Sequence, residues 1–158
     1  MARIDQLRSG EGVRWRSIRL RALEEAPYAF GTKYAEAVQW SAARWEAQVL
    51  EFATFIAVLD GRDVGLVRGA VDRRSHLREL ISMWVAPEAR HQGIGARLIE
   101  SVAAWATAAG ATALVLDVVA ANAPAIALYE RAGFQRSDDA SLGEPAPNEI
   151  RLVRRLVG

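Results

Sequence analysis

Apolar residues recur with helical spacing in the first third of the chain. Trp15, Ile18 and Leu23 fit one face of a helix that ends before Pro27. The same spacing predicts a second helix over residues 35–50. Two helices are therefore expected before the first long apolar strand.

Short apolar runs separated by polar turns follow these helices. Residues 52–59, 64–71 and 76–85 each have the length and composition of a strand. Asp60-Gly61 between the first two is typical of a tight hairpin turn, because both positions there need positive φ. Since all the connections are short, the three strands are predicted to form an antiparallel meander. A further short strand is expected over residues 3–7.

The second half alternates helices with strands. A helix is predicted from Ile94 to Ala109, with Gly110 as its C-terminal cap, and a buried strand follows over residues 113–119. This order makes the crossover parallel and right-handed. A short helix over residues 122–132 and a last hairpin, 134–137 with 149–156, complete the chain. The expected fold class is α/β or α+β, a mixed sheet with helices on both faces.

Composition narrows the class of protein. The 158 residues are 51% hydrophobic and 25% charged, with a net charge of +1, which predicts one globular domain over residues 1–158. The charge gives no reason to expect a nucleic-acid or membrane partner. Cysteine is absent, which fits a cytoplasmic location. With two histidines, no metal site is expected. No apolar run approaches the roughly 20 residues of a membrane span, and the N-terminus lacks a signal-peptide core.

A glycine-containing loop follows the third strand of the meander. Arg90, Gly93 and Gly95 form the pattern R-x-x-G-x-G at the start of a helix. Glycines let backbone amides approach a ligand, and a helix N-terminus favours a phosphate. The loop is not a Walker A motif, because Ala96 and Arg97 follow Gly95, and Leu98 breaks the dinucleotide fingerprint.

A second motif, N-x-x-A-x-x-L-Y-x-x-x-G-F, spans residues 122–134. With the loop, it resembles the GNAT family of acyl-CoA N-acyltransferases over roughly residues 76–134. The resemblance implies a central mixed sheet of about six to seven strands, splayed between strands 4 and 5 to admit acetyl-CoA as co-substrate. It implies an acceptor pocket lined by the two early helices, and a homodimer is common in the family.

The resemblance also assigns residues. The backbone near the end of the third meander strand would hold the pantetheine arm and thioester, the loop would hold the pyrophosphate, and the second motif would contact pantetheine and sulfur. The implied cofactor-binding residues are Met83, Trp84, Val85, Arg90, His91, Gln92, Gly93, Ile94, Gly95, Ala96, Asn122 and Tyr129. Asn122 is equally consistent with a helix N-cap, and Tyr129 with a core position.

The chemistry requires a neutral amine, a base and an acid. We expect Glu79 as the base. It precedes Arg90 by 90 − 79 = 11 residues, the spacing at which the histone-acetylating branch of the family places its glutamate. Strand alternation would put Glu79 on one face with Ile81 and Met83, although a bulge would alter that register. An ion pair across the sheet is the alternative role for Glu79, and Asp117 and Glu51 are the other candidate bases. Tyr129 is the expected acid, and the Val85 amide the oxyanion donor.

Several alternatives stay open. The first functional hypothesis is direct transfer of the acetyl group from acetyl-CoA to a primary amine in a ternary complex. The second is a GNAT-fold module that binds acyl-CoA without catalysis, and a nucleotide enzyme ranks third. The acceptor could be a protein N-terminus, a lysine, a polyamine, an amino acid or a drug. Four arginines of the first helix form either a solvated face or a wall of the acceptor site: Arg14, Arg16, Arg19 and Arg21.

Overall fold

One mixed sheet of seven strands, in the order β1-β2-β3-β4-β5-β7-β6, forms the centre of the protein in a computed structural model that describes residues 1–157. The expected class is confirmed. Gly158 lies outside the described residues. The strands are β1 (Arg3–Gln6), β2 (Ala53–Leu59), β3 (Arg62–Val71), β4 (Leu77–Val85), β5 (Ala113–Val119), β6 (Gln135–Arg136) and β7 (Glu149–Arg155). The sheet is antiparallel except where β4 pairs with β5.

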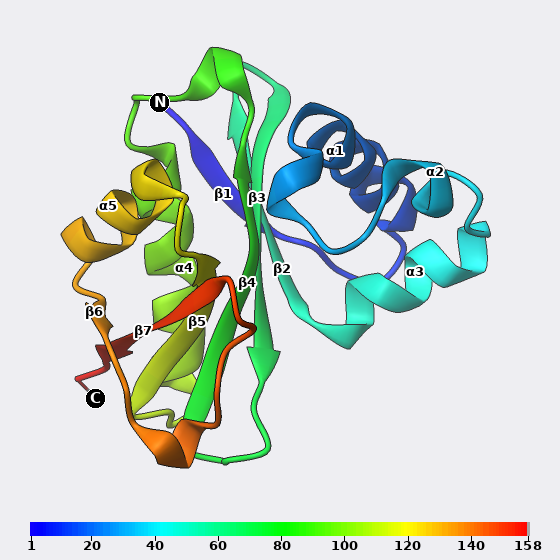
Figure 1. The fold of residues 1–158 in the computed structure, drawn as a ribbon. Coiled ribbons are helices and arrows are strands. Elements are labelled where there is room, and N and C mark those ends of the chain that lie inside the picture. The colour runs from blue at the N-terminus through cyan, green and yellow to red at the C-terminus, as the bar shows by residue number, and fades with distance from the viewer. Residues whose placement is uncertain (158) are drawn as a thin grey trace.

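Helices cover both faces of the sheet (Figure 1). On one side lie α1 (Gly12–Glu25), α2 (Tyr34–Ala37) and α3 (Ala42–Glu51), and on the other lie α4 (Ile94–Ala108) and α5 (Ala123–Arg131). Three single 3-10 turns join these elements: η1 (Pro27–Ala29), η2 (Pro87–Ala89) and η3 (Ala140–Leu142). Within residues 1–157, no helix combines the length and apolarity that crossing a bilayer would need.

The meander forms as predicted. Asp60 and Gly61 have φ of 52° and 75°, the two positive values that a tight hairpin turn requires. The crossover through α4 is also confirmed, since β5 is parallel to β4. The helix packs its apolar stripe on the sheet, and Leu98, Ile99 and Val102 are fully buried. Favourable burial of this stripe fixes the start of α4 beside the end of β4.

The single helix expected over residues 35–50 is wrong. The structure has two helices instead, because the chain leaves α2 after Ala37 and Ser41 begins α3 as its N-cap, its hydroxyl accepting from Arg44 N at 3.1 Å. Trp45 is buried in the core, whereas Trp40 stays half-buried against it, with 5.0 Å between ring centroids. The N-cap at Ser41 therefore starts a separate helix, where the apolar spacing had predicted one continuous helix.

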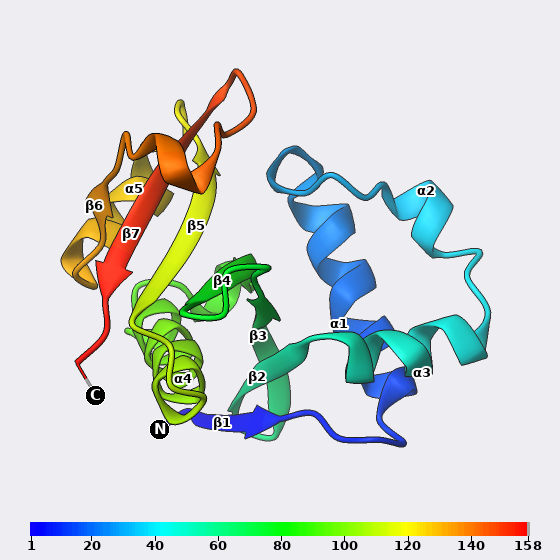
Figure 2. The same cartoon turned by 90° about the horizontal axis from the view of Figure 1, so that it is seen from below.

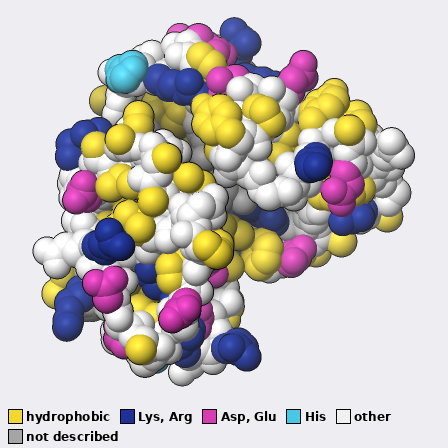
Figure 3. Space-filling view, viewed as in Figure 1, with side chains coloured by type: hydrophobic (Ala, Val, Ile, Leu, Met, Phe, Trp, Pro, Cys, Tyr) yellow, Lys and Arg dark blue, Asp and Glu magenta, His cyan; other side chains and the backbone are white. Residues whose placement is uncertain are grey.

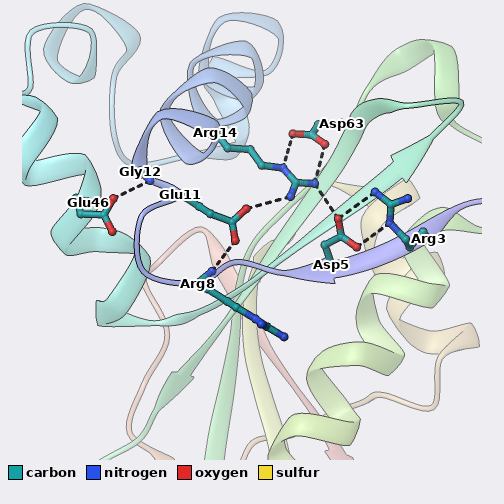
Figure 4. A network of polar contacts seen from close by, with 8 residues as sticks. All are labelled: Arg3, Asp5, Arg8, Glu11, Gly12, Arg14, Glu46 and Asp63. Carbon is teal, nitrogen blue, oxygen red and sulfur yellow. Dashed lines mark hydrogen bonds and ion pairs between the residues drawn. The ribbon is translucent and has the colours of Figure 1, made fainter.

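Ion pairs fix the N-terminus of α1 to its neighbours (Figure 4). Arg14 bonds both oxygens of Asp63, at 2.9 Å each, and also contacts Asp5 and Glu11. Glu46 of α3 accepts from the Gly12 amide at 2.9 Å, satisfying one of the free donors at the helix start. The side of the sheet that carries α1 is thus held by partners from β1, β3 and α3.

Candidate functional site

Strands β4 and β5 separate after three paired positions. Leu77, Arg78 and Glu79 lie opposite Ala113, Leu114 and Val115, respectively. Beyond Glu79, β5 turns away from β4 and pairs only with β7 (Figure 2). The predicted splay between the fourth and fifth strands is therefore present, and Glu79 is the last residue of β4 that pairs with β5.

A bulge in β4 lies inside this opening. Ser82 has φ of 59°, and the register with β3 shifts between the pairs Leu66–Trp84 and Arg68–Ile81. The extra residue reverses the alternation of side chains beyond it. Trp84 consequently shares the α1 side with Ile81, where its indole donates to Glu25 of α1 at 2.9 Å. The expectation that unbroken alternation would group Met83 with Ile81 and Glu79 is wrong for Met83.

Beyond the bulge, β4 has an unpaired backbone edge that faces the opening, because β5 has turned away. Ala86 N donates to Val64 O at 2.7 Å, across the β3 side of the strand. Because successive amides of a strand point to opposite edges, the Val85 amide points to the edge that β5 has left. This is the place where an oxyanion donor was expected.

Glu79 is half-buried beside a cavity of about 40 Å³ at the base of the opening. Two arginine–aspartate pairs share this cavity: Arg74 with Asp72 at 2.7 Å, and Arg151 with Asp117 at 2.8 Å. The Glu79 carboxylate forms no ion pair or hydrogen bond within residues 1–157. Burial, then the nearby charges of Asp117 and Asp72, raises the pKa of Glu79. A carboxylate in such surroundings is a better base at neutral pH than a solvated one. The cavity exceeds the roughly 10–15 Å³ that one water needs.

The other candidate bases have different surroundings. Asp117 accepts from both Nε and Nη2 of Arg151, at 2.8 and 2.9 Å, and so is fully committed. Glu51 is exposed at the end of α3. Of the three acids considered, Glu79 alone combines partial burial with a free carboxylate, and the ion pair considered as its alternative role is not formed.

The loop before α4 presents free backbone donors. The first backbone bond within the helix runs from Arg97 N to Gly93 O at 3.2 Å, so the amides of the preceding residues have no acceptor in the helix. His91 and Gly93 have φ of 63° and 79°, and the free amides lie at the positive end of the helix dipole. An anion could be bound here.

The two loop glycines serve different purposes. A Cβ on Gly93 would meet no atom within 4 Å, so its requirement is the positive φ. A Cβ on Gly95 would lie 3.0 Å from Leu128 Cδ2. Gly95 therefore allows α5 to pack closely against the first turn of α4. The sequence pattern alone did not separate these roles.

Arg90 lies beside the loop but is already engaged. Its Nε donates to Val85 O at 2.9 Å, and its Nη2 pairs with Glu25 at 2.6 Å. The same Glu25 oxygen accepts from Trp84. Glu25 thus links α1, β4 and the loop, and no local sequence signal indicated this role.

The second motif forms α5 on the far side of the opening. Asn122 is the N-cap, its Oδ1 accepting from Ala125 N at 3.3 Å, which leaves its amide NH₂ available. Tyr129 is 6% exposed and packs edge-on against Phe134, with 5.8 Å between centroids. Burial raises the pKa of Tyr129, so the hydroxyl stays protonated at neutral pH. A protonated phenol donates a hydrogen bond readily and gives up its proton reluctantly.

Comparisons with known proteins find similar sequences and similar folds. A sequence profile of the Acetyltransferase (GNAT) family matches residues 15–134. An IAA acetyltransferase from Azospirillum brasilense is 36% identical over 97 residues, which make up 61% of this chain and 62% of that relative. The match thus spans less than two thirds of the relative's length.

Solved structures share the fold. The GNAT-family acetyltransferase from Streptococcus pneumoniae superposes with a TM-score of 0.77 at 18% identity, covering 99% of this chain and 100% of that one. The PaiA N-acetyltransferase from Thermoplasma acidophilum, in complex with coenzyme A, gives a TM-score of 0.76 at 14% identity, covering 98% and 99%. At these identities the likeness concerns the fold.

Proposed function

The chain belongs to the GNAT acetyltransferase family, and from this premise we propose that it transfers the acetyl group of acetyl-CoA to a primary amine. The observation that carries the proposal is the opening between β4 and β5, with the free carboxylate of Glu79 at its base. The backbone edge near Val85 and the start of α4 border the same opening.

The proposed cofactor seat uses backbone groups more than side chains. The pyrophosphate binds the amides of residues 92–96, where the helix dipole and unpaired donors favour an anion. The pantetheine arm runs along the free edge of β4 at residues 83–85, and Asn122 contacts it from the other side. Arg90 contributes little to the seat while Val85 and Glu25 hold its guanidinium.

The proposed reaction is direct attack in a ternary complex. Glu79, itself or through a water in the cavity, takes a proton from the bound ammonium, and the free amine attacks the thioester carbon. The N–C bond forms, the carbonyl oxygen becomes an oxyanion at the Val85 amide, and the C–S bond then breaks. The departing thiolate accepts a hydrogen bond from Tyr129, and the amine's remaining excess proton completes the free thiol. Since the chain has no cysteine, no thioester-linked enzyme intermediate is involved.

A melting experiment tests the cofactor. Acetyl-CoA at a hundredfold excess over its dissociation constant should add about 2.7 kcal/mol to the free energy of unfolding. ATP and NAD should give much smaller shifts. Equal shifts with all three ligands, or none, would reject the seat. Binding without release of free thiol on any amine would indicate a non-catalytic acyl-CoA-binding module.

A matched pair of glycines tests the loop. Gly93 and Gly110 stand at the two ends of α4 with φ of 79° and 83°, and neither has a neighbour within 4 Å of an added Cβ. Gly93→Ala and Gly110→Ala should thus carry similar backbone strain. Only Gly93→Ala should weaken binding of acetyl-CoA, and it should affect a truncated pantetheine thioester far less. Equal loss for both ligands would assign the loop a structural role.

A further inference from the structure

Two arginines, one buried and one half-buried, lie beneath the helices that cover β3. Arg68 of β3 is 6% exposed; its Nε donates to Thr54 Oγ1 at 3.0 Å and its Nη2 donates to Gln48 O. Its guanidinium carbon lies 4.7 Å from the ring centroids of both Trp15 and Phe52. Backbone, hydroxyl and aromatic partners hold this cation, and within residues 1–157 no carboxylate pairs with it.

Arg19 of α1 lies beside this first arginine with fewer partners. Its Nη1 is buried and has no hydrogen-bond partner in the described chain. The guanidinium carbon lies 4.5 Å from the Phe30 centroid and 5.9 Å from that of Trp15. Burial lowers the pKa of Arg19, and burial together with the charge of Arg19 lowers the pKa of Arg68. Within residues 1–157 neither cation forms an ion pair, and the charge of Glu51 offsets the lowering of the Arg68 pKa only in part.

A buried, charged donor without a partner is unfavourable, and folded proteins rarely leave one. The helix neighbours of Arg19 show the contrast. Arg14 bonds three carboxylates, and Arg21 donates to Asp63 O at 2.7 Å. Arg16 is exposed to water. Arg19 is therefore the arginine of α1 whose position suits an anion that is not part of the chain.

The two arginines lie on the face of the sheet that carries Glu79. Arg68 is directly opposite Ile81, and Glu79 is two residues before Ile81 on the same face. Strand spacing puts the Cα atoms of Arg68 and Glu79 about 8 Å apart. Figure 3 shows basic atoms in the hollow between α3 and the segment that joins η1 to α2, beside the opening of the sheet.

We propose that the acceptor amine also carries a carboxylate, which binds Arg19 with the field of Arg68 behind it. This inference rests on the proposed function, in which Glu79 receives the amine's proton. A free amino acid carries both charges within reach of one sheet face. A polyamine or a lysine within a protein lacks the anion and would face two arginines that form no ion pair within residues 1–157. The acceptor class is therefore a free amino acid rather than a polyamine or a protein lysine.

The test compares free amino acids with their amides as acceptors. Free thiol is measured at saturating acetyl-CoA for parent, Arg19→Gln and Arg19→Lys. Arg19→Gln should lower kcat/KM for the acids by about 10²-fold, a typical cost of removing one partner of a buried charge pair. The amides should change little, and Arg19→Lys should recover part of the loss. Since each acceptor is compared between parent and variant, the different basicities of acids and amides cancel. Arg16→Gln, on the exposed side of α1, is the control.

A second readout keeps the inference separate from the proposed function. Ligand-observed NMR with the same acids and amides reports binding without turnover. Carboxylate-dependent binding that Arg19→Gln removes supports the inference, even if no amine is acetylated. Absence of any acetyl-CoA shift or thiol release rejects the proposed function alone. Equal loss for acids and amides in Arg19→Gln would make Arg19 a support for the Phe30 segment and overturn the inference, as would unchanged carboxylate binding.

Discussion

Two charged clusters on the α1 side of the sheet are balanced in opposite ways. Around the cavity at the base of the opening, both arginines are paired and the carboxylate of Glu79 is left over. Beneath α1, Arg68 is held by backbone, hydroxyl and aromatic partners, and Nη1 of Arg19 is left without a hydrogen-bond partner. In each cluster the neighbours satisfy one another, so the leftover group marks where a ligand of opposite charge would bind. The difference predicts an acceptor with a positive and a negative end.

The sharpest way to break this comparison is to neutralise Glu79. Glu79→Gln should lower kcat by about 10²–10⁴-fold, the usual contribution of a general base. The loss should shrink as pH rises, because more of the amine is already neutral. Steady-state pH profiles of parent and variant check this. A variant that matches the parent at every pH would show that Glu79 is not the base.

A substitution of Tyr129 tests the proposed role of an uncharged hydrogen-bond donor at the site. Tyr129→Phe keeps the ring and its packing against Phe134 but removes the hydroxyl. Turnover should fall by about 10²-fold while acetyl-CoA affinity changes little, and high pH should give no rescue. The measurement is kcat beside a cofactor titration. Unchanged turnover would leave Tyr129 with a packing role only.

A paired group should behave differently from Glu79. Asp117→Asn removes one partner of the Arg151 pair, which is partly buried, with side-chain exposures of 26% and 14%. We expect a loss of about 1–2 kcal/mol in the free energy of unfolding, since Arg151 loses its charged acceptor. Chemical denaturation measures this. If Asp117→Asn instead lost most of its turnover while its free energy of unfolding stayed unchanged, Asp117 rather than Glu79 would be the base.

The smallest expected effect concerns stability and pH. The pKa of Glu79 is raised from its ordinary value of 4.5, so ionisation of this carboxyl costs the folded state. The contribution of the protonated carboxyl to the free energy of unfolding is fully present below pH 4.5. This contribution is lost as pH rises through the raised pKa. Glu79→Gln does not titrate. Its Tm relative to the parent should therefore increase from about pH 4 to about pH 7. A constant difference would contradict the raised pKa.

Local signals predicted much of the fold. The Asp60-Gly61 turn, the bounds of α4 and the start of α5 at Asn122 each depend on residues close in sequence, and each appears where expected. The two family motifs could also be predicted from local sequence, because a loop and a helix cap need few distant partners. The opening between β4 and β5 followed from the family resemblance.

Features set by distant contacts were missed. The bulge at Ser82 reverses the alternation that would have paired Met83 with Ile81, and no residue type announced it. The break between α2 and α3 had a signal in Ser41, a preferred N-cap, which the apolar spacing outweighed. A charged residue within the apolar strand at Arg68 was also a usable signal, because such a residue is rarely buried without a purpose. Arg19 is half-buried partly against Phe30, which lies outside α1, so the pattern within that helix did not indicate it.

The contact between Gly95 and Leu128 constrains how related sequences can vary. Because an added Cβ on the glycine would lie 3.0 Å from the leucine, a larger residue at the first position needs a smaller one at the second. Across homologues, the two positions should therefore covary, although they belong to separate motifs 128 − 95 = 33 residues apart. Sequences that carry alanine at the first position should favour valine or alanine at the second.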